Sequence, residues 1–225
     1  MSVFSILLRS TPAAFVFVML AGCQTTTSPF GQNVTEDGLE RVQVRGIDAV
    51  YRQPGASLAG YTKIQLAPVT VAFQKSWRPE RDSHLYAMNP PDREAIRQEL
   101  AKLFVDTVRD ELRQGGYELV EEAGPDVLSV KASIVDLYIS APDVSMSTPA
   151  ATRTYVMNAG EMTLVAELAD SVTGAVLVRA YDKRRARETG SWQRATSIEN
   201  VAEARRAIRA WASILKEHLD ASRSS

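Results

Sequence analysis

The sequence predicts an α+β fold, in which a mainly antiparallel sheet of four to five strands carries two amphipathic helices packed on one face. Three observations support it: helical periodicity in two segments, alternating apolar residues in several shorter ones, and the order strand, helix, strands, helix. The chain has 225 residues, of which 45% are hydrophobic and 24% charged, as in a globular protein of one domain. Because Cys23 is the only cysteine, the fold must rest on its hydrophobic core without an intramolecular disulfide.

The first predicted strand starts near Tyr61 and is interrupted at Pro68. Apolar residues alternate with polar ones before the proline and resume in the opposite phase after it: Ile64 and Leu66, then Val69, Val71 and Phe73. A polar loop over residues 74–91 follows. It is long for a compact domain, and such loops are often functional.

Two segments carry apolar residues at helical spacing. The first begins at a capping Asp92 and ends at Gly115 and Gly116, with an apolar face of Ile96, Leu100, Leu103, Phe104, Val108 and Leu112. The second opens with a capping box of Thr196 and Glu199, and its apolar face holds Val201, Ile208, Trp211, Leu215 and Leu219. Each is predicted to be a helix with one buried face.

The segment between these helices predicts the remaining strands. A short strand is expected over 117–120, a long one over 127–139, and a hairpin of 161–169 with 175–184 that turns at 170–174. The apolar phase of the long strand changes at Val135, which indicates either a β-bulge or burial on both faces. A second polar loop spans 140–158.

The N-terminal residues 1–22 are predicted to be a signal peptide, because a short apolar stretch follows the positive charge of Arg9. This stretch is shorter than the roughly 20 residues that span a bilayer. Its end resembles the lipobox of bacterial lipoproteins, in the order Leu20, Ala21, Gly22 and Cys23. The resemblance implies cleavage between Gly22 and Cys23 and acylation of the cysteine sulfur. The alternative is an ordinary signal peptide or uncleaved anchor with an incidental Cys23.

Acylation of Cys23 would make the membrane a partner of this protein. Each buried CH₂ contributes about 0.8 kcal/mol, so two or more acyl chains hold a protein stably. In the lipoproteins that the lipobox resembles, Asp after the cysteine favours the inner membrane, so Gln24 implies the outer membrane, facing the periplasm. Residues 23–55 are polar and rich in turn formers, which predicts a tether with at most one short element over 39–50. Residues 56–222 then form the single domain.

The sequence carries none of the common signatures of catalysis. The spacing Gly-x-Ser-x-Gly and the glycine-rich phosphate loops are absent, and acylation would leave no free thiol. We therefore expect no catalytic residue, cofactor or metal site. A hydrolase of envelope polymers or lipids is the alternative, with His84 and Asp82 as its candidate acid/base groups. His218, near the end of the last helix, suits an exposed position that interacts with the helix dipole.

One stretch of the chain is rich in cations and is the candidate binding segment. It contains Arg179, Lys183, Arg184, Arg185 and Arg187, with Trp192 and Arg194 close behind. These residues can meet anionic lipid, envelope polymers or an acidic partner, or they can protect an edge strand against aggregation. The whole chain has 26 basic and 27 acidic residues, which argues against a nucleic-acid partner.

Several segments resemble a bacterial lipoprotein family that is known only as a domain of unknown function: 123–128, 159–162 and 167–174, with Pro54-Gly55 and Tyr61 upstream. The resemblance implies an envelope lipoprotein and brings no reaction. We therefore expect a non-enzymatic accessory or binding module that contacts an envelope protein or polymer through its sheet edge or loops. A lipid-handling auxiliary of a transport system is a further alternative, and it needs an apolar groove between sheet and helices.

Overall fold

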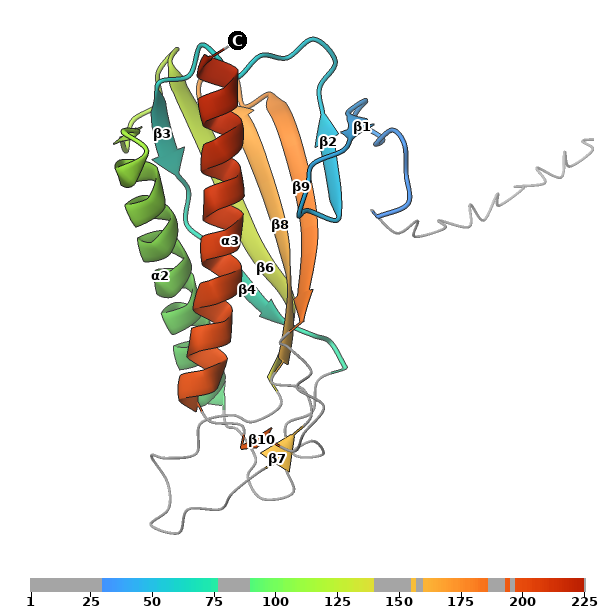
Figure 1. The fold of residues 1–225 in the computed structure, drawn as a ribbon, viewed down its shortest axis with the longest axis vertical. Coiled ribbons are helices and arrows are strands. Elements are labelled where there is room, and N and C mark those ends of the chain that lie inside the picture. Colours follow the sequence, from blue (N-terminus) through green and yellow to red (C-terminus); the bar gives the residue numbers. More distant parts are fainter. Residues whose placement is uncertain are drawn as a thin grey trace, which may run out of the picture.

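The computed structural model describes residues 30–76, 90–139, 155–156, 160–185, 193–194 and 197–224. Two layers make up the molecule. One is an eight-stranded sheet, and the other consists of helices α2 (Pro90–Gln114) and α3 (Ser197–Arg223), which lie side by side on one face of that sheet (Figure 1). The α+β class and the placement of both helices on one face are as predicted.

The sheet has more strands than the four to five expected. Its order is β1 (Glu40–Val42), β2 (Ala49–Arg52), β9 (Val176–Arg185), β8 (Gly160–Asp170), β6 (Val127–Ile139), β3 (Lys63–Leu66) and β5 (Glu118–Leu119), while β4 (Thr70–Phe73) also pairs with β6. Strands β7 (Tyr155–Val156) and β10 (Gln193–Arg194) form a separate antiparallel pair.

Three pairings on one side of the sheet are parallel, those of β3 with β5, β3 with β6 and β4 with β6. Helix α2 follows β4 and leads into β5 and β6, and a helical crossover of this kind brings the next strand back in the same direction. The predicted break at Pro68 is confirmed, because β3 and β4 pair in succession with the same edge of β6. Helix α2 begins at Pro90, two residues before the predicted cap at Asp92.

The phase change in the long strand is a β-bulge. Asp136 adopts a φ of 51°, and the register between β6 and β8 shifts between Val135 and Tyr138. The extra residue returns Leu137 to the helix-facing side, where it is buried in the same core as Ile134. Burial on both faces is therefore not needed to explain the sequence pattern.

The predicted hairpin between β8 and β9 is confirmed and has a clear local cause. One carboxylate oxygen of Asp170 accepts hydrogen bonds from the backbone N–H groups of Val172 and Thr173 and from the Thr173 hydroxyl. These bonds lower the pKa of Asp170 below its usual value. Gly174 closes the turn with a φ of 73°, a conformation that glycine adopts without a steric penalty.

The core lies between the sheet and the two helices. Its helical part comprises Leu100, Phe104, Val108 and Leu112 of α2 and Ile208, Trp211, Ala212 and Leu219 of α3. Val201 was predicted to belong to this face but is 45% exposed, because it lies near the start of α3 outside the helix–sheet contact. Helical spacing alone does not show where along a helix that contact begins.

The expected tether over 23–55 is partly folded. Strand β2 pairs with β9 inside the sheet, and its Tyr51 has no exposed surface. Leu39 packs with Tyr51 in a second small core on the face opposite the helices, where Phe30 also lies. At most one short element was expected over 39–50, and two strands are found. Their signal in the sequence is weak because β1 and β2 are only three and four residues long, and their burial depends on the distant strand β9.

Candidate functional site

The predicted binding segment is neutralised by intramolecular partners. Arg179 donates to both carboxylate oxygens of Asp37, at 3.0 and 2.8 Å, and to Glu167 at 2.7 Å. The guanidinium, with help from Thr35, lowers the pKa of Asp37 to about 2. Arg179 therefore ties the N-terminal segment to the sheet and is not free to bind a ligand.

The other described cations of this segment are also paired. Lys183 and Arg185 both form ion pairs with Glu161, at 2.8 and 3.0 Å, and Arg184 pairs with Asp182. Strand β2 pairs with β9 as far as Tyr181, so β9 is an edge strand only beyond that residue. Its charges can therefore protect an exposed sheet edge at that end alone. Arg187 and Trp192 lie outside the described residues, as do the side chains of β10, which contains Arg194.

Asp182 is a buried carboxylate that joins three parts of the fold. It is 3% exposed and accepts hydrogen bonds from Trp211 Nε1 of α3, at 2.6 Å, and from the backbone N–H of Asp48, at 3.0 Å. The Asp48 side chain in turn accepts from the backbone N–H of Lys183 at 2.9 Å. These bonds fix α3 and the segment before β2 to strand β9, which makes Asp182 a structural residue.

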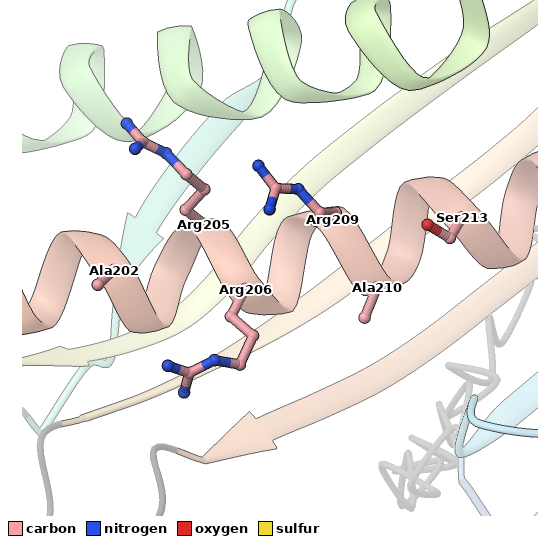
Figure 2. Close-up of a pocket in the computed structure, with 6 residues that line it drawn as sticks. All are labelled: Ala202, Arg205, Arg206, Arg209, Ala210 and Ser213. Carbon is pink, nitrogen blue, oxygen red and sulfur yellow. The ribbon is translucent and has the colours of Figure 1, made fainter. Parts of the chain in front are cut away.

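A cationic hollow lies on the outer surface of α3, and we call it the arginine groove (Figure 2). It has a volume of about 490 Å³ and is lined by Ala202, Arg205, Arg206, Arg209, Ala210 and Ser213. The alanines are too small to fill the surface between the arginines. In Figure 2, the guanidinium groups of Arg205 and Arg209 extend to the side of the helix where α2 lies, and that of Arg206 extends to the opposite side.

The charges of the arginine groove are not compensated in the way those of β9 are. Arg206 forms an ion pair with Glu203. Within the part of the chain that the structure describes, Arg205 and Arg209 have neither a hydrogen bond nor an ion pair, and both side chains are exposed. Like charges four residues apart on a helix destabilise it by about 0.2–0.5 kcal/mol. An anion bound between them removes that repulsion.

The sequence also carries a signal for this groove. Arg205 and Arg209 are four residues apart in a segment already predicted to be a helix, so they had to share one helix face. On α2, by contrast, Lys102 and Arg109 share the carboxylate of Asp106, which stands between them in the sequence. The contiguous cations at 183–185 are a more conspicuous pattern in the sequence and favoured β9 instead.

The other predicted sites are placed as follows. The lipobox residues Leu20, Ala21, Gly22 and Cys23, and the loop residues Asp82 and His84, lie outside the described residues. His218 is exposed on α3, as expected. In the described ranges no group of three or more His, Cys, Asp or Glu side chains is arranged to hold a metal ion. The described helices contain no apolar stretch of the length that crosses a bilayer.

The helix–sheet interface bears on the lipid-handling alternative. That alternative requires an apolar groove between the two layers, and the described part of this space is filled by core side chains. Ile208, Leu112 and Ile134 meet there and have no exposed surface. The hollow that the structure does present at α3 is lined by arginine and small residues, which suit an anionic group better than an acyl chain.

The fold and the groove define a protein of the α+β class with a cationic surface on helix α3. The chain belongs to the family described as "Protein of unknown function (DUF3313)", which matches residues 27–215 and confirms the resemblance to a domain of unknown function. No curated protein matches the chain.

Several solved structures have low similarity to the chain. The PelC dodecamer from Paraburkholderia phytofirmans is 13% identical, with 74% of this chain and 96% of that chain covered and a TM-score of 0.38. A DUF4136 family protein from Bacteroides thetaiotaomicron is 12% identical, with 74% and 95% covered and a TM-score of 0.33. A DUF330 protein from Xanthomonas campestris is 11% identical, with 76% and 93% covered and a TM-score of 0.35.

Proposed function

We propose that this protein is an envelope lipoprotein, anchored through acylated Cys23 and facing the periplasm from the outer membrane, that acts as a non-enzymatic binding module. The lipobox and the apolar stretch before it support the anchor. The observation that carries the binding role is the pair of exposed arginines, Arg205 and Arg209, which have no partner among the described residues. Their planar guanidinium groups bind carboxylates and phosphates through paired hydrogen bonds.

The proposed binding surface lies on α3 and not on the sheet edge or loops that the sequence favoured. The cations of β9 already have acidic partners, so they contribute little to the recognition of a second molecule. Figure 2 shows the guanidinium groups of Arg205 and Arg209 on the side of α3 where α2 lies, and both side chains are exposed, so an anion can reach them from solvent. An envelope protein or an anionic envelope polymer is the class of partner that this groove fits.

Site-directed photo-cross-linking in the protein's own cells tests this proposal. A photoreactive residue at Ala202, which lines the groove, is compared with one at Lys131, which is exposed on strand β6. We expect a discrete cross-linked product from position 202 and none from position 131. Products of equal yield from both positions, or none from position 202, would refute the groove as the binding surface. Mass spectrometry of the mature N-terminus checks the anchor separately, since an unmodified Cys23 removes that part of the proposal alone.

A further inference from the structure

We infer that the arginine groove receives an acidic helix of a partner protein and not the bilayer in which the proposed anchor sits. The inference rests on the proposed function, because it identifies the class of partner that binds at the same surface. Three observations carry it: the face of the sheet on which Phe30 lies, the overall charge of the helix layer, and the spacing of Arg205 and Arg209.

Phe30, the first described residue after the proposed anchor, lies on the face of the sheet opposite α3. Asp182 points to the helices, because its carboxylate bonds to Trp211, and neighbouring strand residues point to opposite faces. Tyr181 therefore points away from the helices, and Phe30 packs edge-on against it with ring centroids 6.1 Å apart. The seven residue steps from Cys23 to Phe30 reach at most about 25 Å. The chain from the proposed anchor therefore joins the domain on the face that α3 does not occupy.

The charge of the helix layer also disfavours a planar anionic surface. Helix α2 contains six acidic and five basic residues, and α3 contains four acidic and five basic ones. The two helices together are therefore neutral, with His218 counted as uncharged. A flat membrane laid across both helices would meet as many carboxylates as cations, whereas a narrow partner can contact the groove alone.

The spacing of Arg205 and Arg209 fits a helical partner. Residues four apart on a helix are separated by about 6 Å along its axis, and acidic side chains at the same spacing on a second helix match them. Ala202 and Ala210 leave room for the second helix to approach α3 closely. A stretch of the partner helix with Glu or Asp at positions i and i+4 therefore places one carboxylate on each guanidinium.

Protection of the arginines from phenylglyoxal, a reagent that modifies guanidinium groups, tests the inference on the full mature lipoprotein. The protein is first incorporated into vesicles of neutral phosphatidylcholine, and flotation shows whether it is anchored. The modification rates of Arg205 and Arg209 are then measured by mass spectrometry under three conditions: with a synthetic alanine-based helical peptide that carries Glu at i and i+4, with inorganic phosphate, and in vesicles containing phosphatidylglycerol.

We expect the acidic peptide to lower both modification rates at least fivefold, and phosphate and phosphatidylglycerol to leave them unchanged. Peptide binding, followed by anisotropy, should weaken about tenfold or more in Arg205→Gln, Arg209→Gln. The matched control is Lys102→Gln, Arg109→Gln on α2, which removes the same charge from residues paired with Asp106 and should bind as the unmodified protein does.

Three results would overturn the inference: protection by phosphatidylglycerol, protection by phosphate equal to that by peptide, and equal modification rates in every condition. The first identifies the bilayer as the occupant, the second a small anion, and the third a solvated helix face. Failure of the protein to float with the vesicles contradicts the proposed anchor instead. The peptide measurement, repeated in neutral detergent, then still decides whether the groove recognises an acidic helix.

Discussion

Replacement of Asp182 by alanine is expected to lower the free energy of unfolding by about 2–4 kcal/mol. The substitution leaves the buried Trp211 Nε1–H and the part-buried Asp48 backbone N–H without their acceptor. An unsatisfied buried donor costs about 1–3 kcal/mol, and a part-buried one costs less. Arg184 also loses its counter-ion, but its side chain is 33% exposed and water replaces much of that interaction. The loss is large against the roughly 5–15 kcal/mol that stabilises a typical domain.

Urea unfolding of the purified protein, followed by far-ultraviolet circular dichroism, measures this effect as a lower midpoint at unchanged slope. Asp106→Ala is the matched control, because its carboxylate is 45% exposed and pairs with Lys102 at the surface, so its loss should cost at most about 1 kcal/mol. Asp182→Asn keeps one oxygen acceptor and should fall between the two. If Asp182→Ala lost no more stability than Asp106→Ala, the carboxylate would not connect α3 to the sheet as described.

Three further outcomes are expected. The double variant Arg205→Gln, Arg209→Gln should unfold at the same urea concentration as the unmodified protein, or its free energy of unfolding should rise by about 0.3 kcal/mol, because only the repulsion between the two arginines is removed. A clear loss of stability would show that these arginines stabilise the fold. The pKa of Asp37 is about 2 in the folded protein, below its usual 3.8. The ionised carboxylate therefore adds its full contribution to the free energy of unfolding above about pH 4, and this contribution disappears as the pH falls towards about 2. Because the Asp37 side chain is 47% exposed, this contribution should be at most about 1 kcal/mol, and acid titration of Asp37→Asn should show a flatter stability profile. Gly160→Ala should lower the free energy of unfolding by about 2–3 kcal/mol, because a Cβ would lie 2.6 Å from the Tyr138 carbonyl oxygen at a φ of 142°. In Gly174→Ala the new Cβ meets nothing within 4 Å, so the loss should be about 1 kcal/mol. Equal losses of the two variants in thermal unfolding would contradict this reasoning.

The structure-forming signals that could be interpreted from the sequence act over short distances along the chain. The repeat of Leu100, Phe104, Val108 and Leu112 identified α2, because helix geometry alone puts these residues on one face. Asp170 and Gly174 identified the hairpin, because the turn is closed by hydrogen bonds within five residues. The break at Pro68 was equally local, because proline interrupts a strand wherever the strand lies in the sheet.

What only the tertiary structure decided is which distant residues meet. Arg179 and Asp37 are 142 residues apart, so the sequence offered no means of knowing that this cation is satisfied. The burial of Tyr51 likewise depends on its pairing with β9, which turned part of an expected tether into a strand of the sheet. The helical spacing of Arg205 and Arg209 is a property of the sequence, but their lack of a partner among the described residues is a property of the fold. A charge becomes a candidate for binding only after the neighbours that could neutralise it have been placed, because electrostatic pairing depends on separation in space and not along the chain.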